Sequence, residues 1–178
     1  MIQKYKDFID SGCFNKVLHL DNDWLIKMPL SVDDDLHLPY NNRILDKFKI
    51  HIKFMKDNPD FFPEVKQLDK YRAAVKKLDT QKAREELYYI IQTIPIEIKD
   101  KLTLKGSSIA NIFTDNSEES KLLLTTLNEN DPMIKKWLNF FIKIKTILKP
   151  KLRIQSAFDA HIGNYGLEKD GTPKLIDW

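Results

Sequence analysis

The sequence has 178 residues, of which 42% are hydrophobic and 11% aromatic, so it can bury a core as one domain or as two small lobes. The 29 Lys and Arg outnumber the 26 Asp and Glu only slightly and are spread along the chain, which gives no argument for nucleic-acid binding. A single Cys13 excludes an internal disulfide framework, and we expect neither a signal peptide nor a membrane span. The expected location is the cytoplasm.

The first predicted element is a β-hairpin. A β-prone run follows Gly12, an Asp-Asn-Asp turn occupies residues 21–23, and a second β-prone run, Trp-Leu-Ile-Lys, ends at Lys27. Because glycine leaves the backbone uncovered, Gly12 at the first bend would let N–H groups approach phosphate oxygens.

An amphipathic helix and two strands are expected next. The helix spans residues 39–57, and Asn58-Pro59 ends it. Segments 62–68 and 71–78 are predicted to be strands that complete a five-stranded antiparallel sheet. The helix has an apolar stripe at helical spacing, made of Ile44, Leu45, Phe48, Ile52 and Met55.

From Thr80 onward the pattern is helical. We expect a helix over residues 80–92, two short helices with loops over 96–130, and a long helix that begins at Asp131-Pro132, an N-cap followed by proline. The change of pattern predicts two lobes, residues 1–79 and 80–178. The buried face of the long helix is expected to hold Ile134, Trp137, Leu138, Phe141, Ile144 and Leu148.

The region near the C-terminus contains three polar residues of the types found in catalytic and metal-binding sites: Asp159, Asn164 and Asp177. Two short strands are predicted on either side of a turn at residues 169–172, since Asp-Gly readily supplies positive backbone angles. The hairpin would bring Asn164 close to Asp177, and an amide oxygen with a carboxylate suits Mg²⁺ bound to phosphate. Asp159 is then placed to orient or deprotonate a hydroxyl. The predicted strands are residues 165–167 and 174–176.

The spacing of these three residues carries a resemblance. Asp159 and Asn164 in a D-x-x-x-x-N pattern, followed thirteen residues later by Asp177, resemble the catalytic loop and metal-binding Asp of the protein-kinase-like fold. The finer form, Asp-Ala-His-Ile-Gly-Asn with a terminal Ile-Asp-Trp, is similar to aminoglycoside and choline phosphotransferases and to small phage-encoded Ser/Thr protein kinases. The resemblance implies an α+β, bilobal fold with a five-stranded antiparallel N-lobe sheet plus helix, and a truncated helical C-lobe with catalytic loop and β-hairpin.

The same resemblance implies roles for the catalytic residues. Asp159 would be the base, Lys27 would contact the α- and β-phosphates of ATP, and Asn164 and Asp177 would hold Mg²⁺. Asp46 would replace the acid that pairs with Lys27, with a surface Asp as the alternative reading.

Nucleotide-binding residues follow from the resemblance as well. The bend after Gly12 is similar to the second half of a kinase Gly-rich loop, with Phe14 at its tip and Val17 beneath the adenine. Asp10 occupies the position of one of that loop's glycines, as Asn15 does of another. The hinge, whose backbone would bind adenine, is expected near Leu78.

Three functions fit these residues. The first is an ATP- and Mg-dependent phosphotransferase, a phage-type protein Ser/Thr kinase acting in the host cytoplasm. The second is a pseudokinase-like module that engages or inhibits a protein partner, and the third is a small-molecule kinase of the aminoglycoside type. Because the sequence stops just after Asp177, we expect either an acceptor site built from residues 80–150, or a partner or second copy that covers the truncated lobe.

Overall fold

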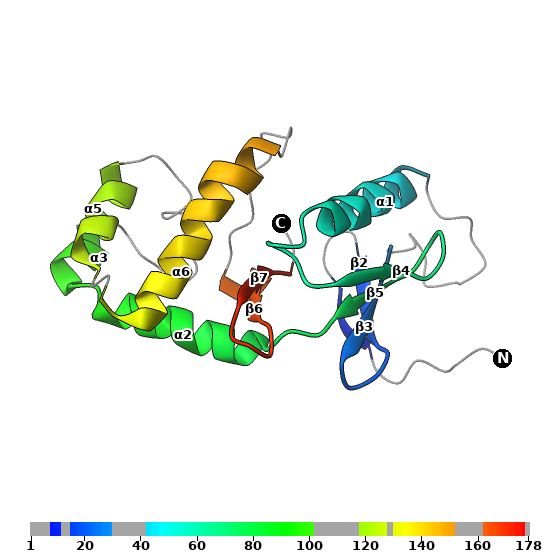
Figure 1. Cartoon of the computed structure of the whole chain (residues 1–178), viewed down its shortest axis with the longest axis horizontal. Coiled ribbons are helices and arrows are strands. Elements are labelled where there is room, and N and C mark those ends of the chain that lie inside the picture. The colour runs from blue at the N-terminus through cyan, green and yellow to red at the C-terminus, as the bar shows by residue number, and fades with distance from the viewer. Residues whose placement is uncertain are drawn as a thin grey trace. The chain divides into compact units, whose positions relative to one another are not determined.

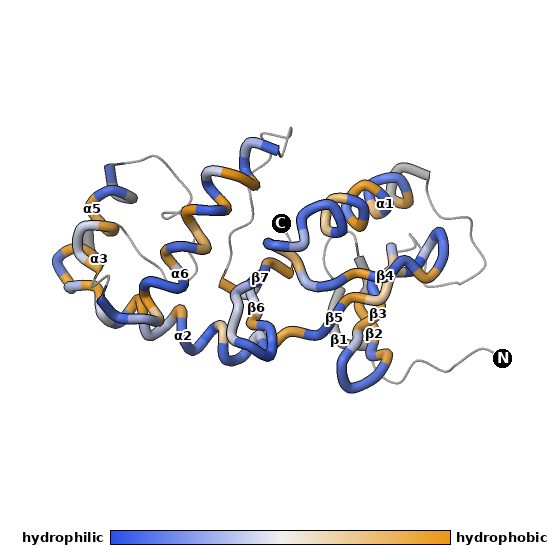
Figure 2. The backbone as a smooth tube through the Cα atoms, viewed as in Figure 1, coloured by the Kyte–Doolittle hydropathy of each residue, from blue (hydrophilic) through white to orange (hydrophobic). Residues whose placement is uncertain are grey.

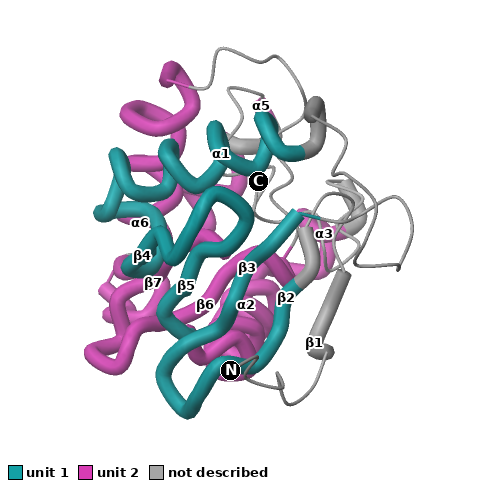
Figure 3. The backbone as a smooth tube through the Cα atoms, turned by 90° about the vertical axis from the view of Figure 1, so that its right-hand side faces the viewer, with its two compact units in different colours: residues 1–77 teal, residues 78–178 magenta. Residues whose placement is uncertain are grey.

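The computed structural model describes residues 8–11, 15–29, 42–101, 118–127, 130–151 and 162–176. The chain divides into two compact units, residues 1–77 and 78–178 (Figure 3). Antiparallel strands and helices occur together, which confirms the expected α+β class. Within the described residues, no helix is both long and apolar enough to cross a membrane.

Unit 1 contains an antiparallel sheet with the strand order β1-β2-β3-β5-β4 (Figure 1). The turn between β2 and β3 is closed by Asp21, whose Oδ1 accepts hydrogen bonds from the backbone N–H groups of Asp23 and Trp24 at 2.8 and 2.9 Å. Such an Asx turn explains why the Asp-Asn-Asp run joins two strands. The strands are β1 (Phe8–Ser11), β2 (Asn15–His19), β3 (Trp24–Pro29), β4 (Val65–Gln67) and β5 (Ala73–Lys76).

Helix α1 (Asn42–Asp57) packs on β3 and β4 of this sheet. Its apolar residues gather along one side of the helix (Figure 2). The helix ends where predicted, because the Asn58 side-chain amide donates to the Phe54 carbonyl at 2.8 Å. Four members of the predicted stripe are buried: Leu45, Phe48, Ile52 and Met55.

Unit 2 is built from helices and one hairpin. The predicted start of its long helix is confirmed, because Asp131 caps α6 by accepting from the N–H of Met133 at 2.8 Å. A hydrogen bond from the Tyr89 hydroxyl at 2.9 Å, with the cap bonds, lowers the pKa of Asp131. The elements are α2 (Thr80–Thr93), α3 (Ile96–Lys101), α5 (Glu118–Thr126), α6 (Pro132–Lys143), a π-helical turn (Ile144–Leu148), 3₁₀ turns (Lys149–Lys151 and Ile162–Asn164), β6 (Tyr165–Leu167) and β7 (Pro173–Leu175).

The core of unit 2 is an aromatic cluster between α6 and β6. Tyr165 places its ring edge against Trp137 and Phe141, with centroids 5.9 and 5.6 Å apart and interplanar angles of 89°. Each such pair contributes about 0.5–1.5 kcal/mol beyond the burial of area. All six residues of the predicted buried face are buried, four on α6 and the last two in the π-helical turn that follows it: Ile134, Trp137, Leu138, Phe141, Ile144 and Leu148.

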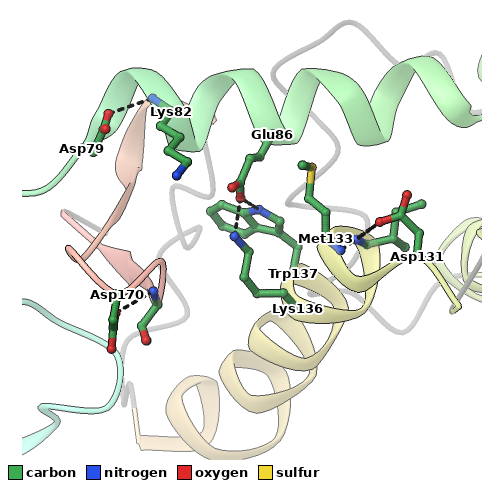
Figure 4. A network of polar contacts seen from close by, with 10 residues as sticks. Asp79, Lys82, Glu86, Asp131, Met133, Lys136, Trp137 and Asp170 are labelled. Carbon is green, nitrogen blue, oxygen red and sulfur yellow. Dashed lines mark hydrogen bonds and ion pairs between the residues drawn. The ribbon is translucent and has the colours of Figure 1, made fainter.

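A buried carboxylate joins α2 to α6. Glu86 is only 8% exposed, and its Oε2 accepts hydrogen bonds from Trp137 Nε1 at 2.7 Å and from Lys136 Nζ at 2.5 Å (Figure 4). A buried charge is tolerated when it is paired and hydrogen-bonded, as it is here. Because Trp137 also contacts Tyr165, this contact helps to fix the aromatic cluster.

We expect Glu86→Ala to lower the free energy of unfolding by about 2–3 kcal/mol, because the buried indole N–H loses its acceptor. The measurement is urea unfolding followed by tryptophan fluorescence. Glu85→Ala is the matched control, since Glu85 is exposed on the same helix and accepts only from Gln81 at 3.0 Å. Equal destabilisation by the two substitutions would contradict the structural role of Glu86.

Candidate functional site

The hairpin β6–β7 forms as the Asp-Gly turn predicted. Tyr165 pairs with Leu175 and Gly166 with Lys174, and the second strand begins and ends one residue earlier than expected. Gly171 has a φ of 86°, the left-handed region that favours glycine, and its N–H donates to the Glu168 carbonyl at 2.9 Å.

Asn164 is joined to the far end of this hairpin. The N–H of Ile176 donates to the Asn164 carbonyl at 2.8 Å, so the backbone that leads into Asp177 lies directly beside Asn164. This supports the prediction that the hairpin brings Asn164 and the end of the return strand together. Asp177 and Asp159 themselves lie outside the described residues.

The residue that precedes α2, Asp79, is hydrogen-bonded to the end of β6. Asp79 and Leu167 exchange two backbone hydrogen bonds, at 2.9 Å from the Asp79 N–H and at 3.1 Å from the Leu167 N–H. The Leu78 side chain is buried against Gly166, where an added Cβ would be 2.5 Å from the Leu78 Cβ. Leu78, predicted as the hinge residue, therefore packs its side chain on the strand that follows Asn164.

In unit 1, Lys27 is a buried cation on the central part of the sheet. It lies on β3, is 5% exposed, and pairs across the strands with Val17 of β2. Residues directly opposite in neighbouring strands present their side chains on the same face of a sheet. Two residues predicted to bind nucleotide, Lys27 and Val17, are therefore brought together, whereas Gly12 and Phe14 lie outside the described residues.

Of the two readings of Asp46, the structure favours a surface residue over a partner of Lys27. Lys27 Nζ lies 2.9 Å from Nε2 of His51 on α1, whereas the Asp46 side chain is 67% exposed and pairs with Lys49 at 3.4 Å. The neighbours of each residue along the helix explain the difference. Asp46 is one turn before the exposed Lys49 and Ile50, and so belongs to the solvent-facing side.

His51 belongs to the sheet-facing side of α1. It is three residues after Phe48 and four before Met55, and both of these side chains are buried. Burial first, and then the charge of Lys27, lower the pKa of His51 well below its ordinary value of 6.5. The imidazole is therefore neutral at pH 7, and its Nε2 can accept a hydrogen bond from the Lys27 ammonium. In the sequence, His51 has the same helical spacing as the apolar residues of the stripe. This spacing is the feature that could have identified it as a neighbour of Lys27.

Unit 1 also has a lysine-lined groove between α1 and the β4–β5 turn. Its volume is about 500 Å³, and Lys53 in it pairs with Asp57 at 2.7 Å. Three of its lysines follow helical spacing, so they gather on one face although basic residues are spread along the sequence. The groove is lined by Lys49, Lys53, Lys56, Asp57, Gln67, Asp69 and Lys70.

No cluster of three His, Cys, Asp or Glu that could hold a metal ion occurs among the described residues. Of the two predicted magnesium ligands, Asp177 lies outside the described residues and Asn164 lies at the start of the hairpin. Its carbonyl bond to Ile176 fixes the backbone there, and the carboxylate that follows in the sequence is a ligand type that Mg²⁺ prefers.

We expect Gly166→Ala to destabilise unit 2 by about 1–3 kcal/mol, because the new methyl group overlaps Leu78. Hydrogen exchange at the amides of Asp79 and Leu167 should become faster, since the overlap pushes apart the strands of that bridge. The control is Gly171→Ala, where an added Cβ meets nothing within 4 Å and only the positive φ is strained. Unchanged exchange in Gly166→Ala would contradict the close contact.

Three comparisons bear on relatives of this chain. Neither family models, curated proteins nor solved structures gave a match to it. Function is therefore inferred from the residues and their geometry.

Proposed function

We propose that the chain is an ATP- and Mg-dependent phosphotransferase, a small phage-type protein Ser/Thr kinase. The observation that carries the proposal is the bond between the Ile176 N–H and the Asn164 carbonyl, which sets the two ends of the hairpin side by side. The D-x-x-x-x-N spacing and the Asp that follows thirteen residues later supply a candidate base, Asp159, and two candidate oxygen donors, Asn164 and Asp177.

The proposed reaction transfers the γ-phosphoryl group of ATP to a Ser or Thr hydroxyl. Asp159 accepts the hydroxyl proton while the oxygen forms a bond to the γ-phosphorus, and the bond to the β-phosphate oxygen breaks to release ADP. Asn164 and Asp177 would hold Mg²⁺, which supplies positive charge to the phosphate oxygens. Most of the catalysis is positioning and charge neutralisation.

Lys27 would supply a fixed positive charge for the phosphates. Its side chain is 5% exposed and is held by His51, so the cation is already oriented before a nucleotide binds. An oriented charge costs no reorganisation at the moment of reaction, which is why a buried lysine fits this role better than a surface one. Val17, opposite Lys27 in the sheet, supplies an apolar neighbour for the adenine.

A protein-binding module is the second candidate, and the lysine-lined groove favours it. Four lysines and two aspartates line this groove, so it attracts a negatively charged partner. Such a module would bind its partner without transferring phosphate. Binding of ATP with no incorporated phosphate in the wild-type protein would favour this second candidate.

We expect Asp159→Ala to reduce autophosphorylation with labelled γ-phosphate by at least about 100-fold, because the hydroxyl loses its proton acceptor.

Lys27→Met should reduce autophosphorylation by about 100-fold, because the contact with the phosphates is lost. Lys76→Met is the control, since Lys76 lies on β5 opposite Trp24 in the same sheet. Full turnover in Asp159→Ala would remove that residue as the base, and equal loss in Lys76→Met would remove the specific role of Lys27.

We expect Asp177→Asn to raise the Mg²⁺ concentration needed for half-maximal ATP binding by about tenfold, since a neutral amide replaces a charged ligand. Isothermal titration of ATP at a series of Mg²⁺ concentrations measures this shift. Asp170→Asn is the matched control in the same hairpin, because Asp170 is exposed and accepts from the Thr172 N–H at 2.9 Å. An unchanged Mg²⁺ requirement in Asp177→Asn would refute its assignment as a ligand.

A further inference from the structure

We infer that His51 is the positioning residue for Lys27, and that a neutral imidazole orients the phosphate-binding ammonium where an acid was expected. The inference rests on the proposed function, because it assigns Lys27 to phosphate. It gives the site a property that an acid–lysine pair lacks, a loss of nucleotide binding when the imidazole is protonated in acid.

The geometry of the pair carries the inference. Helix α1 packs on β3, and the 2.9 Å contact joins Lys27 Nζ of the strand to His51 Nε2 of the helix. Lys27 is 5% exposed, so its long side chain does not move freely through solvent. Removal of His51 would release the ammonium from one of the contacts that orient it.

The chemistry of this pair differs from that of a lysine bound to a carboxylate. A neutral imidazole accepts a hydrogen bond and leaves the ammonium with its full charge. Protonation of His51 would remove the acceptor and place two cations 2.9 Å apart in a buried site. Acid therefore breaks the contact instead of merely weakening it.

The described strands on which α1 packs, β3 and β4, carry two titratable side chains. Lys27 is the only titratable side chain of β3, and β4 supplies Lys66, which is exposed and pairs with Glu64 at 3.2 Å. On α1, Lys47 is one turn before His51 and is exposed. Of these cations, Lys27 is the one whose charge lowers the pKa of His51 and so disfavours its protonation.

The direction of the pH effect follows from the lowered pKa of His51. The unfolded chain takes up a proton near pH 6.5, before the folded chain does. The pair is therefore fully present above this pH, and it is lost as the pH falls through the lowered pKa of the folded state.

The test measures ATP affinity in Mg²⁺ from about pH 7.5 down to the lowest pH at which circular dichroism shows the chain still folded. The full chain is used as wild type, His51→Gln and His51→Leu. The glutamine oxygen can accept from Lys27 but does not titrate, whereas leucine cannot accept. ATP itself takes up a proton in this range, so the difference between wild type and His51→Gln reports on His51.

The expected result is an additional loss of affinity in the wild type, about tenfold for each pH unit below the lowered pKa of His51, which His51→Gln does not show. His51→Leu should bind about tenfold more weakly than wild type at the higher pH. His19→Gln is the matched control, since His19 Nε2 lies 3.5 Å from Lys77 Nζ in an exposed contact of the same type. Identical pH profiles in wild type and His51→Gln, or full affinity in His51→Leu, would overturn the inference.

A second measurement needs no nucleotide and separates the two proposals. The imidazole signals of His51 are titrated by NMR in wild type and in Lys27→Met, with circular dichroism as the check that both are folded. The pKa of His51 should rise when the Lys27 charge is removed. A pKa that is unchanged by this substitution would refute the pair. Absence of ATP binding at every pH would refute the proposed function, while a rise of the pKa in Lys27→Met would still support the pair.

Discussion

The candidate site of unit 2 depends on how a very short hairpin is held. Two strands of three residues are not stable alone in water. Tyr165 is buried against the aromatic residues of α6, and Leu167 is bonded to Asp79 at the start of α2. The position of Asn164 therefore depends on the contacts that the hairpin makes with two helices, and the pairing of the two strands alone would not fix it. The buried Glu86 contact extends this dependence, because it ties α2 to the same tryptophan that Tyr165 contacts.

Features that depend on neighbouring residues were predictable from the sequence. Asp131-Pro132 begins α6, and Asp170-Gly171 forms the turn of β6–β7, because capping and turn chemistry act over a few residues. The apolar stripes of α1 and α6 were predictable for the same reason, since helical spacing alone decides which side chains share a face. The prediction of Asn164 as a site residue rests on the same local reasoning and stays a prediction.

Features that depend on contacts between distant segments were not predictable. The role of Lys27 stays a prediction, and Asp46 was considered as its partner from its interval in the chain and its acidic type, whereas the structure places His51 beside Lys27. The buried side chains of Phe48 and Met55 determine which side of α1 faces the sheet. His51 lies on that side and Asp46 does not. The contact between Leu78 and Gly166 has no sequence pattern, because it arises only when α2 and the hairpin pack together. Gly12, Phe14, Asp159 and Asp177 lie outside the described residues, so their roles stay predictions.

The bridge between Asp79 and Leu167 also bears on the order in which unit 2 can be assembled. Its two partners lie at opposite ends of this unit's sequence, with α2 and α6 between them. A ribosome delivers both helices before the strand that completes the bridge, and closing so long a loop is entropically costly and slow. The hairpin is thus among the last parts of unit 2 to form. A newly made chain would carry folded helices for some time before the strands beside Asn164 were in place.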